Sequence, residues 1–183
     1  MKEVSIIIPL RNEEKYLDEL FESLKKQEIN HLKLEYIFID GCSEDNTQKI
    51  LFNKINELNH KSVVLVNPKK QTPSSLNMGI HKASGEFIIR MDGHSIYPKE
   101  YIQRLVDIHL KYDCQNCGGT IRTIPSDNKF IIPVVISEAL SSKFCVGDSK
   151  FRTENNKQKK IIEVDTVPFG CFKRDLLILF STQ

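Results

Sequence analysis

The sequence predicts an α/β fold with a mostly parallel central sheet flanked by helices. Short apolar runs of strand type alternate with segments of helical periodicity along the chain, and this order is typical of βαβ units. The first run, residues 4–10, is almost continuously apolar, as expected of a strand that is buried on both faces of a parallel sheet. The 183 residues contain no internal repeat and no low-complexity linker, so a single domain is the simplest prediction.

The first helix is predicted directly after this strand. Asn12 can cap it, with Glu13 and Glu14 in the first turn, where acidic side chains are favourable. Its apolar face is formed by residues at helical spacing, namely Tyr16, Leu17, Leu20, Phe21 and Leu24.

Two further strands are predicted at residues 34–39 and 63–66. The second strand stops at Asp40, and the third ends at Asn67-Pro68, because Asp, Asn and Pro all favour turns. The helix between the two strands carries its apolar residues on one face: Leu51, Ile55 and Leu58.

The second half of the chain follows the same alternation. Pro73 opens a helix that Gly79 and Gly85 are expected to keep weak or brief, and a fourth strand runs over residues 87–91. Pro98 suits the first turn of the next helix, whose apolar positions are Tyr101, Ile102, Leu105 and Ile108. The remaining elements are a strand at Gly118-Gly119, a helix near 131–141 and a late strand over 161–167.

Composition and charge exclude several classes of protein. Apolar residues make up 40% and charged residues 27% of the chain, which is ordinary for a folded protein in water. The net charge of +2 argues against a nucleic-acid partner. Five cysteines without secreted-scaffold spacing, no signal peptide and no long apolar run predict a cytoplasmic protein. A peripheral association with the inner face of the membrane stays open.

Polar residues follow the predicted strands where ligands bind in an open parallel sheet, outside the carboxyl ends of the strands. A single cluster of this kind can mean no more than a turn, because Asp and Gly favour turns. Three clusters on one edge of the sheet predict a binding site instead. They are Pro9, Arg11 and Glu13 after the first strand, Asp40 and Gly41 after the second, and Arg90, Asp92 and His94 after the fourth.

The residue types in these clusters suit a nucleotide diphosphate. Asp40 could accept hydrogen bonds from a base or a sugar hydroxyl, and Gly41 would let the ligand approach the backbone. Asp92 and His94 can face a divalent cation, Mg²⁺ or Mn²⁺, that bridges a diphosphate and acts as a Lewis acid on it. Lys69, Lys70 and Arg90 are candidate phosphate neighbours, with exposed surface cations as the alternative for each.

These motifs resemble those of family 2 glycosyltransferases. Residues 8–14 resemble the family's opening P-x-R/Y-N-E-E, and residues 38–47 are similar to its V-D-D-G-S-x-D-x-T turn. Asn77-Met78-Gly79, residues 83–86 and residues 90–94 match its N-x-G, A-x-G-E and D-x-D block in order, with His94 in place of the last acid. Residues 139–142 and 164–170 resemble the branch that includes succinoglycan-type exopolysaccharide enzymes.

The resemblance implies a GT-A fold, inverting transfer from a UDP-sugar donor and a set of donor-site residues. Asp92 would bind the metal and the diphosphate, with His94 as the second metal ligand, and Asp40 would hold the uracil or the ribose. Asp45 would be structural and cap the following helix. The implied nucleotide-sugar contacts are Pro9, Arg11, Glu13, Asp40, Gly41, Lys70, Asn77, Arg90 and Asp92.

The catalytic base implied by the resemblance does not match a residue of this chain. In the family it is an acid of an E-D motif that follows a Gly-x-Phe/Arg-Arg segment. Residues 170–174 correspond to that segment, and residues 175–183 hold no paired acid. We therefore expect a C-terminally truncated chain with its base beyond Gln183, and Asp165 is a weak substitute. Residues 1–96 would form the nucleotide-binding half and 97–183 an incomplete acceptor half.

The leading hypothesis is a transferase that moves the sugar onto a polysaccharide or a lipid-linked oligosaccharide. The alternative is a catalytically inactive or truncated nucleotide-sugar-binding module. A nucleotidyltransferase would need a glycine-rich basic loop after the first strand, which residues 10–14 lack. The donor sugar, the acceptor and the oligomeric state are not predicted.

Two groups of residues outside these motifs also suggest chemistry. Cys114-x-x-Cys117 has the spacing of a redox motif or of half a zinc site, but no second pair accompanies it, which favours incidental thiols. His31, His60, His81 and His109 are expected at the surface, and Glu138 is expected on a solvated helix face.

Overall fold

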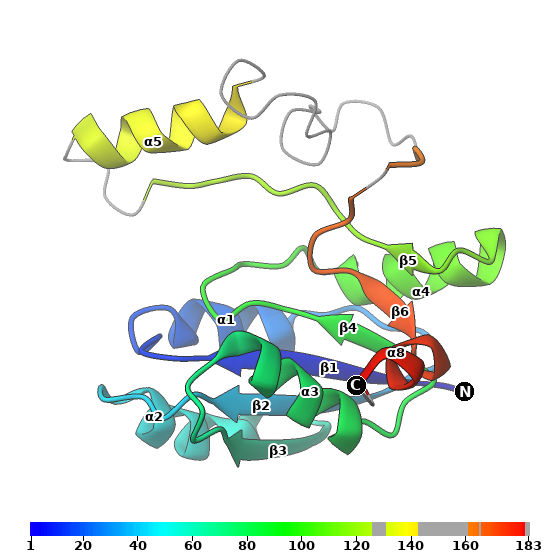
Figure 1. Cartoon of the computed structure of the whole chain (residues 1–183), viewed down its shortest axis with the longest axis horizontal. Coiled ribbons are helices and arrows are strands. Elements are labelled where there is room, and N and C mark those ends of the chain that lie inside the picture. The colour runs from blue at the N-terminus through cyan, green and yellow to red at the C-terminus, as the bar shows by residue number, and fades with distance from the viewer. Residues whose placement is uncertain (126–130, 143–160, 165, 182–183) are drawn as a thin grey trace. The chain divides into compact units, whose positions relative to one another are not determined.

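The computed structural model describes residues 1–125, 131–142, 161–164 and 166–181. The chain divides into two compact units, the first comprising residues 1–117 and 169–183 and the second residues 118–168 (Figure 1). The single-domain organisation and its division near residue 96 stay predictions.

The first unit is built on a six-stranded sheet in the order β3-β2-β1-β4-β6-β5. Strands β1 to β4 are parallel, whereas β6 runs antiparallel to both β4 and β5. The predicted mostly parallel sheet is therefore confirmed. The strands are β1 (Lys2–Leu10), β2 (Leu32–Asp40), β3 (Lys61–Val66), β4 (Phe87–Arg90), β5 (Asn116–Cys117) and β6 (Cys171–Lys173).

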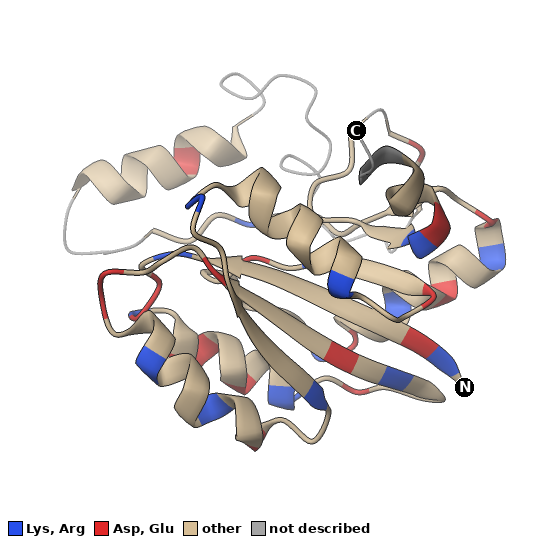
Figure 2. Ribbon diagram, turned by 60° about the horizontal axis from the view of Figure 1, so that its bottom comes forward, with Lys and Arg blue, Asp and Glu red and all other residues tan. Residues whose placement is uncertain are grey.

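Helices cover both faces of this sheet. The larger core cluster joins one face to α1 (Leu17–Lys25), α2 (Thr47–Lys54) and α4 (Tyr101–Tyr112), and a 3₁₀ turn, η1 (Ile55–Glu57), follows α2. The smaller cluster joins the other face to α3 (Thr72–Lys82) and α8 (Arg174–Ser181). Strand β1 serves both cores because successive side chains point to opposite faces: Ile6 and Ile8 belong to the larger cluster, and Ile7 to the smaller one. Charged residues lie mainly on the helices and loops (Figure 2).

The start of the first helix differs from the prediction. α1 begins at Leu17, so Glu13 and Glu14 lie in the preceding loop and not in the first turn. Asn12 does not cap the helix. It has a left-handed φ of 56°, and its side chain accepts a hydrogen bond from the Glu44 backbone. The polar side chains of this loop bind the neighbouring loop instead of the helix end.

Three later elements also differ. α3 is a full 11-residue helix, although its glycine was expected to keep it weak or brief. Gly79 lets the helix pack closely on the sheet, because a Cβ at this position would lie 2.5 Å from Ile7 Cγ2. The short strand predicted at Gly118-Gly119 lies at Asn116–Cys117. Residues 161–164 and 166–167 form no strand, since Phe172, further along the chain, pairs with Ile88 and Asn116 at that edge.

The second unit contains α5 (Ile131–Ser141), which confirms the helix predicted near 131–141. Ser137 Oγ donates a hydrogen bond to the Thr123 carbonyl at 2.9 Å and joins α5 to the preceding segment. Within the part of the chain that the structure describes, no helix combines the length and the apolar character needed to cross a bilayer.

Candidate functional site

The carboxyl ends of β1, β2 and β4 meet where the strand order of the sheet reverses. The chain proceeds from β1 outward to β2 and β3, and then returns to place β4 on the other side of β1. Leu10 at the end of β1 pairs with Asp40, and the Met91 amide donates to the Ile7 carbonyl at 3.0 Å. In open α/β sheets such a reversal opens a crevice in which ligands bind.

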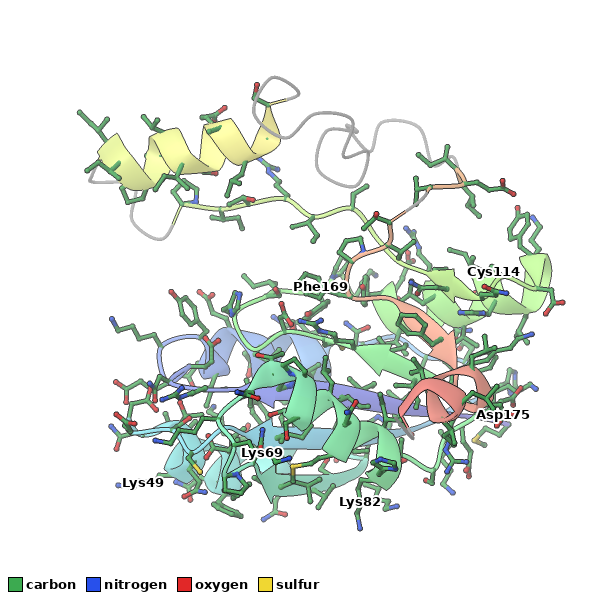
Figure 3. The ribbon with its side chains drawn as sticks, viewed as in Figure 1. Lys49, Lys69, Lys82, Cys114, Phe169 and Asp175 are labelled. Carbon is green, nitrogen blue, oxygen red and sulfur yellow. The ribbon has the colours of Figure 1, made fainter. Side chains whose placement is uncertain are left out.

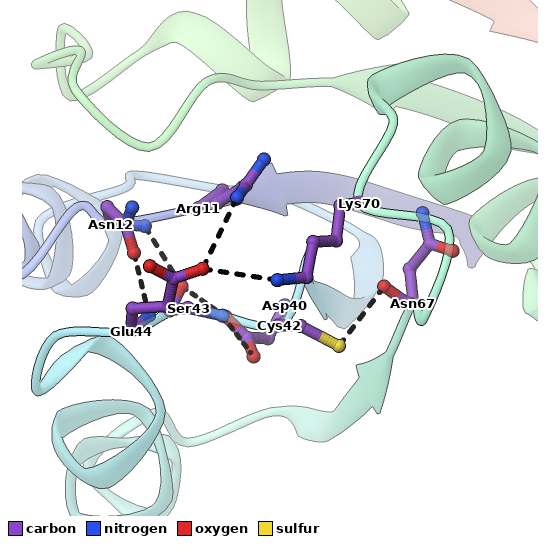
Figure 4. Close-up of polar contacts among 8 residues, drawn as sticks. All are labelled: Arg11, Asn12, Asp40, Cys42, Ser43, Glu44, Asn67 and Lys70. Carbon is purple, nitrogen blue, oxygen red and sulfur yellow. Dashed lines mark hydrogen bonds and ion pairs between the residues drawn. The ribbon is translucent and has the colours of Figure 1, made fainter.

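The loops after β1 and β2 are joined by side-chain hydrogen bonds to backbone (Figure 4). The Asn12 amide donates to Ser43 Oγ at 2.9 Å, and the Glu44 amide donates back to Asn12 Oδ1 at 2.8 Å. The Glu13 amide donates to Thr47 Oγ1 at 2.8 Å. These reciprocal bonds hold the two loops in a fixed relation, which is needed if both contact one ligand.

Asp45 completes this connection and has the structural role that was expected. Its carboxylate accepts hydrogen bonds from the Thr47 amide at 2.9 Å and the Glu14 amide at 3.2 Å. Glu14 in turn accepts from the Asn46 amide at 2.9 Å. Asp45 thus satisfies a backbone N–H at the start of α2, as a capping residue does.

Asp40 is fully buried, although the sequence placed it in contact with a base or ribose. Its carboxylate accepts hydrogen bonds from Ser43 Oγ at 2.5 Å and from the Ser43 amide at 3.2 Å. In this arrangement the Asp40 carboxylate is not accessible to a ligand. At neighbouring Gly41, a Cβ would make ordinary contacts, the nearest with the Leu10 carbonyl oxygen at 3.4 Å.

Two cations from different loops share one carboxylate at this edge (Figure 4). Glu44 Oε1 lies 3.1 Å from Lys70 Nζ and 3.6 Å from an Arg11 Nη atom. The hydrogen bond and charge of Lys70, with the charge of Arg11, lower the pKa of Glu44. All three side chains are exposed, and exposed pairs contribute little stability. Both cations can therefore exchange this carboxylate for a phosphate.

Asn67 organises the loop that carries Lys70, and sequence reasoning missed it. Its side chain is buried, donates to the Gln71 carbonyl at 3.0 Å and to Ser75 Oγ at 2.9 Å, and accepts from the Lys69 amide at 3.0 Å. The Lys70 amide donates to the Asn67 carbonyl at 3.2 Å. An Asn-Pro pair directly before two lysines was the available signal.

The segment after β4 holds a largely buried carboxylate beside an arginine. Asp92 has a side chain 13% exposed, 3.3 Å from an Arg90 Nη atom, and its amide donates to Tyr97 Oη at 2.6 Å. Burial raises the pKa of Asp92, and the positive charges of Arg90 and His94 oppose this shift. The Arg90 guanidinium lies 4.7 Å from the centre of the Phe169 ring, and its buried Nε has no hydrogen-bond partner.

His94 contacts the loop after β1. Its Nδ1 lies 2.8 Å from Glu13 Oε1, and the two side chains are 56% and 16% exposed. The hydrogen bond to Glu13 raises the pKa of His94. Glycine between Asp92 and His94 leaves room for the buried Leu10 side chain, because a Cβ at Gly93 would lie 2.1 Å from Leu10 Cδ2.

The types of ligand atom at this edge suit a hard divalent cation. If the Nδ1–H of His94 donates to Glu13, then Nε2 carries the free lone pair, an arrangement usual for metal-bound histidines. Asp92 adds a carboxylate oxygen, and the remaining positions of a Mg²⁺ or Mn²⁺ ion are ordinarily filled by water and substrate phosphates. Among the described residues, one group of three potential metal ligands has its ligand atoms within 4.8 Å of one another. This group lies at a different place in the fold and does not include Asp92 or His94.

The other predicted residues are less central to this edge. Pro9 is half-buried within β1, and Asn77 is exposed on α3, the one predicted donor contact that lies inside a helix. Asp165, the weak candidate for the base, is outside the described residues, and Glu163 is exposed. Two cavities of about 50 and 450 Å³ lie at the opposite, amino-terminal ends of the strands and are both lined by Glu3, Ser84 and Gly85.

A doubly covered parallel sheet with acids, a histidine and cations at its switch point defines an α/β protein of the nucleotide-binding type. The chain belongs to glycosyltransferase family 2, whose model matches residues 5–178. The GT-A fold expected from the sequence motifs is likewise shown by solved structures of similar architecture.

Several known proteins are similar to this chain. The poly(ribitol-phosphate) β-N-acetylglucosaminyltransferase TarS of Staphylococcus aureus is 33% identical over 103 residues, 56% of this chain and 18% of its own length. The succinoglycan biosynthesis protein ExoA of Rhizobium meliloti is 28% identical over 150 residues, 81% of this chain and 44% of its own. The chain therefore spans less than half the length of either relative.

Among solved structures, a crystal structure of S. aureus TarS in complex with UDP matches with a TM-score of 0.69 and 22% identity, over 98% of this chain and 49% of that one. A mannosyltransferase from Pyrobaculum calidifontis in complex with GDP-mannose and Mn²⁺ matches with a TM-score of 0.66 and 16% identity, over 97% and 46%. At these identities the likeness shows the fold alone.

Proposed function

We propose that this chain binds a UDP-sugar at the carboxyl edge of β1, β2 and β4 and takes part in transfer of the sugar, with inversion, to a saccharide or lipid-linked acceptor. The observation that carries the proposal is the contact of His94 with Glu13 at 2.8 Å. It joins the loop after β4 to the loop after β1 across the switch point, where a diphosphate and its cation would bind.

Different residues at this edge would bind the metal ion, orient its histidine ligand and contact the phosphates. Asp92 and the Nε2 atom of His94 would hold Mn²⁺ or Mg²⁺, which when bound neutralises charge on the leaving diphosphate. Glu13 would orient His94, in place of the nucleoside contact that the sequence motif implied. Arg11 and Lys70 would leave Glu44 to contact the phosphates, because both lie at this edge and pair with an exposed carboxylate.

The known relatives support the kind of donor and cofactor. Similar structures contain UDP, UDP-GlcNAc, or GDP-mannose with Mn²⁺. A relative from Methanococcus voltae is named for transfer onto a dolichyl-linked sugar phosphate. It is 26% identical over 194 residues, which cover all of this chain and 58% of the relative's own length. A lipid-linked acceptor would bring the protein to a membrane surface from the cytoplasmic side.

Binding of UDP in the presence of Mn²⁺ tests the proposal without requiring a base or an acceptor. At a ligand concentration 100 times the Kd, binding stabilises a protein by about 2.7 kcal/mol, which for a chain of this size raises Tm by roughly 2–4 °C per kcal/mol. We expect such a rise for UDP with Mn²⁺ and a smaller one for UDP with a chelator. Asp92→Asn should remove the difference.

Asp107→Asn is the matched control, because Asp107 is an exposed acid on α4 that is not at the carboxyl edge. It should keep the Mn²⁺-dependent rise. An Asp92→Asn variant that folds normally and keeps the full rise would contradict the assignment of the metal site. Binding of UDP without hydrolysis of any UDP-sugar would support the nucleotide-sugar-binding module over the transferase.

A further inference from the structure

A second group of metal-ligand types lies in the core, at the antiparallel edge of the sheet. One donor atom each from His109, Cys117 and Cys171 lie within 4.8 Å of one another, and all three residues are buried. Cys114 Sγ lies 3.6 Å from His109 Nδ1. None of these cysteines is in a disulfide. The expectation that His109 lies at the surface was wrong.

Local structure explains how residues 62 positions apart come together. α4 ends at Tyr112 because Asp113 adopts a left-handed conformation with φ 46°, which turns the chain back into β5. Cys117 on β5 is the antiparallel partner of Cys171 on β6, and both sulfur atoms lie within 4.8 Å of a His109 ring nitrogen on α4. Figure 3 shows Cys114 at this turn between α4 and β5.

The His109 ring is already oriented as a ligand. Its Nε2 lies 2.6 Å from the Cys171 carbonyl oxygen, which can only accept a hydrogen bond, so the proton belongs on Nε2 and the lone pair on Nδ1. Metal-bound histidines usually donate their other N–H to a carbonyl or carboxylate in this way. Packing of the ring against Phe87, with centroids 5.4 Å apart, holds its orientation.

We propose that His109, Cys114, Cys117 and Cys171 form a structural Zn²⁺ site. Three thiolates and one imidazole are a typical closed tetrahedral zinc set, and soft sulfur ligands select Zn²⁺ over Mg²⁺ or Mn²⁺. Zn–S bonds of about 2.3 Å imply ligand atoms roughly 3.5–3.8 Å apart. Cys114 Sγ and His109 Nδ1 are 3.6 Å apart, and the ligand atoms of His109, Cys117 and Cys171, which lie within 4.8 Å of one another, would move closer together on binding. Cys117, whose thiol now donates to the Leu105 carbonyl at 3.3 Å, would bind as the thiolate.

The site has a structural use in this fold. β5 and β6 comprise only two and three residues, and short strands at a sheet edge have few ladder hydrogen bonds to hold them. A zinc ion would join both strands to the end of α4. This role is independent of donor binding, because the ligands sit on other elements than Asp92 and His94, and three of the four are soft sulfur atoms instead of oxygen.

Metal analysis of the reduced, untagged chain tests the site. We expect about one Zn²⁺ per chain after zinc loading and gel filtration, as a closed four-ligand site requires. Substitution by Co²⁺ should give a thiolate-to-metal charge-transfer band, which oxygen and imidazole ligands at Asp92 and His94 cannot produce. Cys114→Ser, at a half-buried loop position, should weaken zinc binding and reduce this band, and Cys117→Ser and Cys171→Ser should abolish both.

Cys42→Ser is the control, since Cys42 lies in the loop after β2, and it should retain zinc and the charge-transfer band. The zinc content and the Co²⁺ charge-transfer band of the wild-type chain test the proposal even if a variant with a substituted core cysteine fails to fold. A folded, reduced wild-type chain that retains no zinc and shows no charge-transfer band overturns the proposal. So does a native Cys117–Cys171 disulfide, or full zinc occupancy in folded Cys117→Ser and Cys171→Ser variants.

Discussion

Nδ1 of His94 lies 2.8 Å from Oε1 of Glu13, and this contact joins loops that are 81 residues apart in sequence. It crosses the point at which the strand order of the sheet reverses. The His94 imidazole is thereby held by a carboxylate that is itself largely buried.

Glu13→Gln should weaken Mn²⁺ binding. The amide keeps the shape of the carboxylate but loses the charge that orients the imidazole, and loss of such a partner typically costs 10–100-fold in metal affinity. Titration of Mn²⁺ into the chain with saturating UDP measures this change. Glu19→Gln, at an exposed position of α1, should bind Mn²⁺ as the wild type does. Equal affinities in all three proteins would show that Glu13 does not position His94.

Gly93→Ala should destabilise the fold, and Gly41→Ala should not. The new Cβ at position 93 would lie 2.1 Å from Leu10 Cδ2, whereas at position 41 its nearest contact is at 3.4 Å. Overpacking of this kind costs roughly 1–3 kcal/mol. Urea unfolding of both variants measures the difference. If Gly41→Ala retains stability but weakens UDP binding, the predicted close approach of the ligand at Gly41 is supported.

Asn67→Ala should loosen the loop that carries Lys70. The buried amide makes several hydrogen bonds within this loop, and each buried partner left unsatisfied costs roughly 1–3 kcal/mol. We expect lower stability in urea and weaker UDP binding together. Asn53→Ala, at an exposed position of α2, should change neither quantity. Unchanged UDP affinity in Asn67→Ala would remove Lys70 from the donor site.

Stability should fall in acid through Glu35. Burial opposes ionisation of this carboxylate, but hydrogen bonds from Ser5, Ser84 and Lys61 outweigh it and lower its pKa from 4.5 to about 2. Because the folded-state pKa is the lower one, the contribution is complete above about pH 4.5 and is lost as the pH falls towards 2. The shift corresponds to roughly 3 kcal/mol.

Urea midpoints measured from neutral pH down to about pH 3 test this linkage. Glu35→Gln should be less stable than the wild type at neutral pH and should lose much of the decline in stability in acid. Glu86→Gln, which alters an exposed acid, should keep the decline. A Glu35→Gln variant with the wild-type pH profile would contradict the linkage.

The parallel half of the sheet could be predicted from sequence because it depends on local patterns. The apolar run of β1 and the turn residues Asp40 and Asp92 mark strand ends whatever the rest of the chain does. The same patterns could not show that Asp40 turns inward to Ser43. An acid at a strand end looks the same whether it faces a ligand or caps its own turn.

Contacts between distant segments could not be predicted in this way. The His94–Glu13 contact depends on the order of strands in space. The cluster of His109, Cys117 and Cys171 depends on antiparallel pairing of β5 with β6. The apolar pattern of residues 161–167, which predicts a late strand there, carries no information about that pairing. Spacing along the chain therefore indicated isolated cysteines where the fold forms a group.

A crystal structure with UDP and Mn²⁺, with the metal located by anomalous scattering, is the most direct test of the donor site. We predict one Mn²⁺ peak bonded to a carboxylate oxygen of Asp92, to Nε2 of His94 and to the diphosphate, with Glu13 still bonded to Nδ1. A UDP–Mn²⁺ complex bound away from the switch point, or one in which Asp92 and His94 face different sides of the molecule, would contradict the account.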